Sequence, residues 1–367
     1  MTPIPQPETA ISTPSTSVPP DEALQRELAP LLVRSGFSSI DDLGWIRVTG
    51  EDRVRWLNGM VTNSIQELKP GHGNYNFLLS AQGRIQGDAH IFVEPSDFAE
   101  PESAEPESAE SEALLMETAL TQISNIIPLL DRFIIMDDVE LADLSGSRSG
   151  LQLAGPDAVA LLSQLFPASI DLAPLQLKAL VWRDQKLTLL HGHSPLVPRF
   201  ELWADLATIT ALSGALQQAG ASVVSHTAFE HLRILEGTPR YGTDIRDREL
   251  PQETAPVGTQ SRALHFSKGC YLGQEIVERI RSRGNVHRTF TGFRLEGALP
   301  PAGTLLEVES KQIGELTSVA AVPFAAGTVQ LALGYVRREA LERRLPITYP
   351  GGTATPTSTP FNLAAAI

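Results

Sequence analysis

The chain has 367 residues, of which 42% are hydrophobic and 20% are charged, and its formal net charge is −14. This composition suits a folded protein of two or three domains. The sequence has no run of about 18 apolar residues, so we predict no transmembrane helix. The single cysteine excludes a disulfide scaffold, and the acidic balance disfavours general nucleic-acid binding. Because the N-terminus shows no basic and apolar leader, we predict a cytoplasmic protein.

Two segments of low complexity stand apart from the globular pattern. Residues 1–20 are rich in proline, serine and threonine, and we predict a disordered tail there. Residues 95–112 form an acidic insert of repeated Glu, Pro, Ser and Ala, which we interpret as a solvated loop between a strand and a helix. The insert carries much of the negative charge, so the folded remainder is less acidic than the total indicates.

The N-terminal half shows strand, helix and hairpin patterns. We predict strands at residues 45–48, 76–79, 85–91 and 133–136, of which the second and third form a hairpin. Helices are predicted at residues 53–60 and 113–135. Asp52 suits the N-cap of the first helix, and Gly83 suits the hairpin turn. Pro128 is expected to interrupt the long helix.

The second half predicts two further units. From about residue 150 to 222 the pattern restarts as a compact α+β unit of the split-βαβ, ferredoxin-like kind. Its strands are predicted at residues 151–154, 178–182, 187–190 and 199–203, and its helices at residues 157–166 and 205–219. From residue 288 to 367, short strands separated by glycine and proline predict a C-terminal β-barrel or sandwich.

Cys270 lies in an unusual local setting. Between residues 262 and 288, six lysines and arginines face only two glutamates, which gives this stretch a local positive charge. A helix predicted at residues 274–283 begins just after the cysteine, so its positive end and Lys268 would favour the thiolate. The alternative is a buried small cysteine ahead of a solvated basic helix. We favour a functional thiol.

Glu236 is the second candidate. It is predicted at the last turn of a helix that ends at Gly237, on or near the apolar face. A carboxylate in that place is costly unless it pairs with a cation or binds the N–H donors of a ligand. A salt bridge with Arg233, Arg240 or Arg246 and a ligand-binding role are equally consistent with the spacing.

Other chemistry receives little support from the sequence. His191 and His193 form a close pair without acidic or thiol partners nearby, and we interpret them as loop residues rather than metal ligands. We therefore predict no metal site. The sequence contains no Walker A loop, no GxGxxG after a strand and no GxSxG, which disfavours nucleotide-driven chemistry and triad hydrolysis.

The octapeptide KGCYLGQE at residues 268–275 resembles the signature of the YgfZ family of folate-binding proteins. That family includes bacterial YgfZ and mitochondrial factors that help to mature 4Fe–4S proteins. Residues 250–253 resemble a second, short stretch of the YgfZ type. Further segments resemble motifs of the glycine-cleavage T protein, an aminomethyltransferase, or its superfamily, at residues 50–63, 235–244, 314–318 and 332–336. The resemblance covers about residues 30–355 without the acidic insert.

The resemblance implies an α+β fold arranged as a T-protein-like ring of three subdomains. These would be an α/β folate-binding subdomain, the ferredoxin-like subdomain and the C-terminal β-barrel, with residues 21–287 forming the folate-binding region. Tetrahydrofolate would occupy a central pocket. The residues implied to bind it are Glu236, Arg233, Tyr271 and Gln274.

The resemblance also implies a reactive centre and a branch of the superfamily. Cys270 and Lys268 would form the functional centre, with Lys268 and the following arginines near the glutamate tail of folate. The T protein uses an aspartate in its second motif region, which we place at residues 124–133. Asp131 lies there outside the T-protein context and is predicted to be a charge on a helix face. We therefore favour the YgfZ branch.

The predicted function is a tetrahydrofolate-binding accessory protein in the assembly or repair of 4Fe–4S proteins. Its partners would be folate and client Fe–S proteins or assembly factors, with no membrane involved, and it would not be a classical enzyme. The alternatives are a folate-dependent, aminomethyltransferase-like one-carbon enzyme and a tRNA-modification factor that binds tRNA through the basic stretch.

Overall fold

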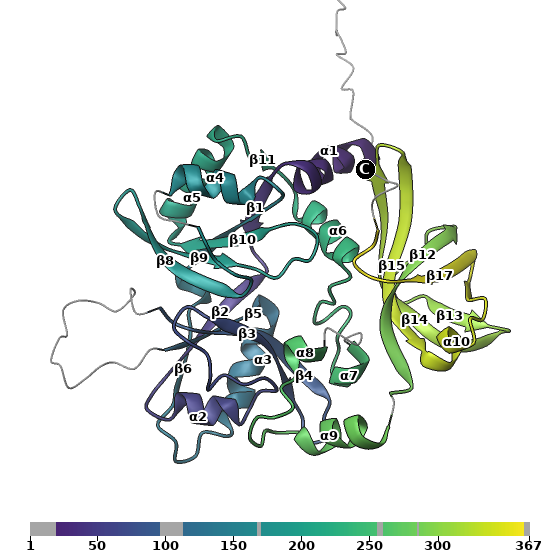
Figure 1. The fold of residues 1–367 in the computed structure, drawn as a ribbon, viewed down its shortest axis with the longest axis horizontal. Helices are drawn as coiled ribbons and strands as arrows, with labels where there is room; N and C mark the ends of the chain where they lie inside the picture. The colour runs from purple at the N-terminus through teal and green to yellow at the C-terminus, as the bar shows by residue number, and fades with distance from the viewer. Residues whose placement is uncertain (1–19, 96–112, 167–169, 255–259, 285, 363–367) are drawn as a thin grey trace, which may run out of the picture.

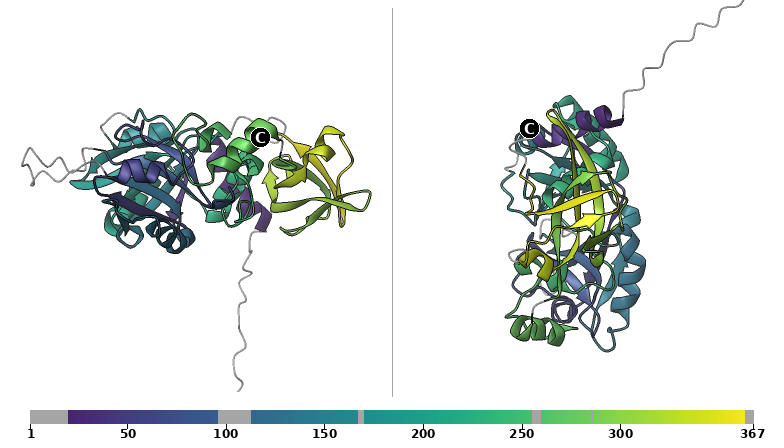
Figure 2. Two further views of the ribbon diagram at one scale, coloured as in Figure 1. Left: turned by 90° about the horizontal axis from the view of Figure 1, so that it is seen from below. Right: turned by 90° about the vertical axis from the view of Figure 1, so that its right-hand side faces the viewer.

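The computed structural model describes residues 20–95, 113–166, 170–254, 260–284 and 286–362. The predicted tail at residues 1–20 and the acidic insert at 95–112 fall almost wholly outside these ranges. Three β-sheet units lie around a common centre (Figure 1). Seen from the side, the ring that they form is thinner than it is wide (Figure 2). This arrangement confirms the predicted α+β fold with a C-terminal barrel.

The first unit is a five-stranded antiparallel sheet in the order β3-β4-β5-β2-β6. Its elements are β2 (Leu43–Thr49), α2 (Arg53–Asn58), β3 (Gly73–Leu79), β4 (Ile85–Val93), β5 (Leu114–Ala119), α3 (Leu120–Asp131) and β6 (Glu140–Asp143). The predicted hairpin is confirmed, because β3 pairs with β4 and Gly83 takes a positive φ of 71° in the turn. Helix α3 packs Ile126 and Leu130 into the core of this unit.

Four predictions within this unit are wrong. Residues 114–119 form strand β5 rather than the start of a helix, because their apolar run is buried between β4 and β2. Helix α3 continues past Pro128 without ending there. Residues 133–136 form a turn and a bend, not a strand. Asp52 does not cap α2 with its side chain, which instead accepts a hydrogen bond from the backbone N–H of Asp138 at 3.0 Å.

The second unit is a six-stranded sheet in the order β11-β1-β7-β10-β9-β8. Its elements are β1 (Gly36–Ile40), β7 (Ser149–Ala154), α4 (Ala158–Leu165), β8 (Gln176–Trp182), β9 (Gln185–His191), β10 (Arg199–Ala204), α5 (Leu206–Gln218) and β11 (Ser222–Val223). Strand β1, which the sequence analysis did not assign, joins this sheet antiparallel to β7 and parallel to β11. Helices α4 and α5 cover one face around Leu162 and Leu212, and the other face borders the centre of the ring.

The third unit is a closed barrel of six strands in the order β12-β15-β14-β13-β16-β17. Its elements are β12 (Arg288–Gly297), β13 (Leu305–Val308), β14 (Lys311–Phe324), β15 (Gly327–Arg337), α10 (Arg338–Glu342), β16 (Thr348–Tyr349) and β17 (Gly352–Thr357). Helices α1 (Pro20–Val33) and α6 (His226–Glu236) lie between the second sheet and the barrel (Figure 1). Phe229 and Leu232 of α6 share a core with Phe290 and Leu333 of the barrel.

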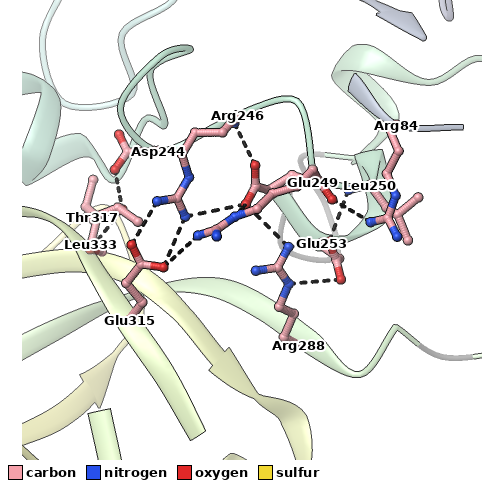
Figure 3. Close-up of polar contacts among 11 residues, drawn as sticks. Arg84, Asp244, Arg246, Glu249, Leu250, Glu253, Arg288, Glu315, Thr317 and Leu333 are labelled. Atoms are coloured by element: carbon pink, nitrogen blue, oxygen red, sulfur yellow. Dashed lines mark hydrogen bonds and ion pairs between the residues drawn. The ribbon is translucent and has the colours of Figure 1, made fainter. Parts of the chain in front are cut away.

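The described residues between α6 and the barrel form three short helices and an ionic network. The helices are α7 (Pro251–Thr254), α8 (Gln260–Ala263) and α9 (Gln274–Arg283). Glu249 is fully buried and pairs with Arg246, Arg248 and Arg288, while Glu315 of β14 accepts from Arg246 at 2.8 Å (Figure 3). The network joins Arg288 and Glu315 of the barrel to the connecting segment and so holds the two together. Removing one partner of the buried Glu249 would be strongly destabilising.

No helix in the described parts of the chain has the length and apolar character needed to cross a bilayer.

Candidate functional site

A cavity of about 520 Å³ lies at the centre of the ring. Its walls come from the first two sheets, from α6 and the loop after it, and from α8. Ionisable side chains dominate its polar lining: Asp42, Asp88, Glu117, Glu201, Glu230, Glu236, Arg199, Arg233, Arg240, Arg262, His90, His193 and His226. The size is that of a small-molecule site, and the excess of carboxylates over arginines favours a ligand with several N–H donors.

Glu236 faces this cavity because of how its helix ends. It is the last residue of α6, and Gly237 closes the helix in the left-handed conformation with a φ of 71°. The side chain is only 7% exposed, and the hydroxyl of Ser194 donates a hydrogen bond to Oε1. Burial raises the pKa of Glu236 to about 6, although Ser194 and the charges of Arg199 and Arg262 act in the opposite direction. Glu236 is therefore a buried carboxylate that is mainly ionised at neutral pH.

Arg233 also borders the cavity, but its guanidinium is bound within the protein. It donates to Glu230 at 2.6 Å, to Asp244 at 2.7 Å and to the hydroxyl of Ser318 at 2.8 Å. The ion pair between Arg233 and Glu236 that the sequence left open is not present. Asp244 is fully buried and also accepts from Thr317 of the barrel. Arg233 thus fixes the end of α6 against the barrel.

The KGCYLGQE loop lies apart from the cavity, and Lys268 has a structural environment there. Its Nζ donates to the backbone carbonyls of Asn58, Val61 and Asn63, each at 2.7 Å. An ammonium has three donors, and all of them are used in these contacts. Burial lowers the pKa of Lys268 to about 7, whereas the three carbonyls favour its charged form.

The neighbours of Lys268 in the loop are arranged around one another. The Lys268 ammonium lies 5.1 Å from the centroid of the Tyr271 ring, and the Tyr271 N–H donates to the side chain of Gln274. Cys270 is exposed and does not line the cavity. The structure therefore brings Lys268, Tyr271 and Gln274 together within the loop that carries Cys270, and places Glu236 and Arg233 at the cavity.

The basic stretch is largely balanced by its own glutamates where it forms α9. Arg279 pairs with Glu275 at 3.2 Å, and Arg281 pairs with Glu278 at 3.6 Å. These pairs are exposed and contribute little stability, and they place both glutamates of the stretch beside its arginines.

Asp88 is a cavity residue that the sequence analysis missed. It lies on β4, where the Tyr75 hydroxyl donates to Oδ2 at 2.5 Å and the Gln122 amide donates to Oδ1 at 2.7 Å. Burial raises the pKa of Asp88 above its ordinary value. Asp131, which was considered instead, is exposed at the end of α3 and does not line the cavity. The cavity therefore contains an aspartate from another strand, so the position of Asp131 does not count against one-carbon transfer.

Glu117 and Glu201 form a buried carboxyl pair that the sequence analysis also missed. Glu117 lies on β5 and Glu201 on β10, so the pair joins the first two sheets, and the two groups are within hydrogen-bonding reach. Burial, with the charge of Glu117, raises the pKa of Glu201 to about 8. Glu117 Oε1 has no other partner in the described residues, so a proton shared with Glu201 would satisfy it. A charged residue inside an apolar strand was the available signal.

The two histidines of the close pair have separate environments. His191 stacks on Phe200 with 4.5 Å between ring centroids, and its Nδ1 contacts the carbonyl of Leu172. His193 lines the cavity, where burial lowers its pKa to about 4. Among the described residues, no group of three or more His, Cys, Asp or Glu side chains is placed to hold a metal ion.

Comparison with known proteins agrees with this architecture. The family model of the GCVT N-terminal domain matches residues 17–256. A chloroplastic protein of Arabidopsis thaliana is 24% identical over 305 residues, and the match spans 82% of this chain but only 65% of that protein. The tRNA-modifying protein YgfZ of Photorhabdus laumondii is 28% identical over 272 residues, with 73% of this chain and 74% of that protein covered.

Two further matches concern an assembly factor and a solved structure. A mitochondrial iron–sulfur cluster assembly factor homologue of Pyricularia oryzae is 28% identical over 256 residues, which are 69% of this chain and 56% of that protein. The crystal structure of glycine cleavage system aminomethyltransferase T from Bartonella henselae superposes with a TM-score of 0.74 over 94% of this chain and 91% of that chain. At 19% identity this likeness is one of fold.

Proposed function

This chain belongs to the family of the GCVT N-terminal domain as a YgfZ-like member, and from that premise we propose that it binds tetrahydrofolate and assists the assembly or repair of 4Fe–4S proteins. The relatives named as a tRNA-modifying protein and as an iron–sulfur cluster assembly factor support the choice of branch. The observation that carries the folate proposal is the position of Glu236 in the central cavity.

Glu236 suits the aminopyrimidine edge of a pterin. That edge presents neighbouring N–H donors, and an ionised carboxylate can accept two of them in parallel. The Ser194 hydroxyl donates a hydrogen bond to Oε1 of Glu236, and this contact fixes the orientation of the carboxylate. The cavity has the volume of a small-molecule site and carboxylates at several points of its wall. Bound folate would supply a one-carbon carrier, and the residues of the chain would bind and orient it.

Cys270 would act at the surface, separately from the folate cavity. Its exposure lets a partner protein reach the thiol, and the fixed loop holds it in one place. Lys268 is then a positioning residue that ties the loop to the end of α2, because its donors are all bound to backbone carbonyls. We propose that client Fe–S proteins or assembly factors contact this loop.

The test compares wild type with Cys270→Ser in cells that depend on this protein for client 4Fe–4S enzymes. The proposal predicts a clear loss of client activity with Cys270→Ser and unchanged folding of the variant by circular dichroism. The exposed Ser282→Ala, on the adjoining helix, is the matched control and should keep full client activity. Full activity with Cys270→Ser would remove the thiol from the proposal.

Folate-dependent one-carbon transfer is the second candidate, and Asp88 favours it. A buried aspartate with a raised pKa, held by Tyr75 and Gln122 at the cavity wall, is the kind of group that can exchange a proton with a bound ligand. Aminomethyl transfer to tetrahydrofolate with purified partner proteins, abolished by Asp88→Asn, would establish this alternative. No transfer by the wild type would exclude it for those partners.

A further inference from the structure

The loop between α3 and β6 exposes two neighbouring large apolar side chains at its tip, residues 133–136, which we call the apolar tip. Ile135 is 84% exposed and Met136 is 93% exposed, and Phe133 just before them is 37% exposed. Among the large apolar side chains that the structure describes, none is more exposed than Ile135 and Met136. An apolar residue that stands alone on a surface is ordinary, whereas adjacent ones mark a site at which another molecule binds.

The apolar tip is held in one place by α2 and by the residue before that helix. The indole N–H of Trp56 donates to the carbonyl of Phe133 at 3.0 Å. Beyond the tip, the backbone N–H of Asp138 donates to the Asp52 side chain at 3.0 Å, and the N–H of Asp52 donates to the carbonyl of Asp138 at 3.1 Å. Because contacts on both sides fix the loop, little conformational entropy is lost when a partner covers it.

The segment that carries Cys270 contacts the opposite end of α2. There the N–H of Leu272 donates to the carbonyl of Gly59 at 3.1 Å, and Lys268 donates to the carbonyl of Asn58 at 2.7 Å. Helix α2 has 6 residues and is therefore about 9 Å long. It lies with α9 along the lower edge of the molecule in the view of Figure 1. A protein interface of ordinary size covers about 800 Å² of each partner, so one partner can reach both the apolar tip and the exposed thiol.

The charges around the apolar tip indicate which partner fits it. Residues 51–55 and 131–140 together contain six carboxylates and three arginines. Arg55 already pairs with two of these carboxylates, at 2.8 and 2.6 Å, whereas Asp131 and Glu140 are exposed. This acidic border repels a membrane of anionic lipids and the same face of a second copy of the chain, and it attracts lysine and arginine side chains.

We propose that the partner protein that uses Cys270 docks on the apolar tip, with Ile135 and Met136 as the anchors of the contact. The docking surface of this partner is an apolar hollow bordered by lysine and arginine side chains. This inference rests on the proposed role of the Cys270 loop and adds to it the residues that hold the partner beside the thiol.

The experiment measures client 4Fe–4S enzyme activity in cells that depend on this protein, with each variant of the full chain expressed at a limiting level. Ile135→Ser/Met136→Ser should lower client activity at least about fivefold, because truncating the anchors of an interface commonly weakens binding about tenfold or more. The matched control is Val181→Ser/Val223→Ser, which removes two valines that are 64% and 60% exposed on the second unit. This control should keep full activity.

Three further measurements separate docking from folding and from folate binding. Because Ile135 and Met136 are exposed, their replacement by serine should leave the midpoint of urea unfolding unchanged. Neither residue lines the cavity, so calorimetry of this variant should give the tetrahydrofolate affinity of the wild type. Asp131→Lys should lower client activity because it reverses a charge of the acidic border, whereas Glu339→Lys, at a glutamate that is 70% exposed on α10, should not.

Full client activity with Ile135→Ser/Met136→Ser, where Cys270→Ser loses it, would overturn the inference and leave the proposed function standing. Full activity with Cys270→Ser would instead refute the thiol function on which the inference rests. Dimers of the wild type in sedimentation velocity, or its binding to vesicles of anionic phospholipid, would overturn the inference if the double serine variant abolished them, because the apolar tip would then have a different occupant.

Discussion

Replacing Glu201 with glutamine should flatten the pH dependence of the stability of this protein. Glu201 is 3% exposed beside Glu117, and burial raises its pKa from 4.5 to about 8. The unfolded chain releases this proton near pH 4.5, whereas the folded protein keeps it until about pH 8. The folded state therefore binds more protons in this window, and its stability falls as the pH rises from 4.5 to 8. At about 1.4 kcal/mol for each tenfold change in proton affinity, the full loss is on the order of 5 kcal/mol.

Glutamine is a suitable replacement because it is neutral and of similar size, and its amide N–H can donate to Glu117 where the shared proton lies. Its single carbonyl oxygen keeps one of the two acceptor contacts, since Arg199 donates to Oε1 of Glu201 and Trp203 donates to Oε2. The assay is urea unfolding at pH 5.5 and pH 8.5, with Glu339→Gln as the control at a glutamate that is 70% exposed. Wild type and Glu339→Gln should lose several kcal/mol between the two pH values, and Glu201→Gln should lose much less. Equal losses in all three proteins would refute the assignment of a proton to this pair.

Three further predictions follow from the site. Lys268→Met should cost about 3 kcal/mol in urea unfolding because three carbonyls lose a charged donor, whereas the exposed Lys69→Met should change stability by less than about 0.5 kcal/mol. Gly237→Ala should destabilise by at least about 1–2 kcal/mol, because the residue has a φ of 71° and its Cβ would collide with Thr359, while Gly214→Ala in open space on α5 should be neutral or stabilising by roughly 0.5–1 kcal/mol. Tetrahydrofolate affinity should fall about tenfold for each pH unit below the Glu236 pKa of about 6, since protonation removes the acceptor, and calorimetry of Glu236→Gln should show no such fall.

The elements that the sequence predicted correctly are those with strong local signals. The glycine stop after Glu236, the Gly83 turn and the helix of residues 274–283 each depend on residues close together in the chain. Strand β5 was mistaken for a helix because a short buried apolar run has no periodicity that separates the two. The error at residues 133–136 has the opposite cause, since Ile135 and Met136 are apolar yet 84% and 93% exposed.

The cavity residues were harder to predict because they meet only in the folded chain. Asp88, Glu117 and Glu201 come from three strands of two different sheets, and nothing in their spacing relates them. Glu236 was found because its position at a helix end is a local feature. Arg262 was counted in a basic stretch, but only the structure separates it from Lys268, which is bound to backbone carbonyls away from the cavity.

A calorimetric titration with tetrahydrofolate tests the central claim most directly, when wild type is compared with Glu236→Ala and the exposed Glu339→Ala. We predict that wild type and Glu339→Ala bind equally well, and that Glu236→Ala binds more weakly by about 1.5–3 kcal/mol, the contribution of a charged hydrogen bond. No binding by the wild type would contradict the folate function. Equal binding by wild type and Glu236→Ala would contradict the role that the cavity gives to this carboxylate.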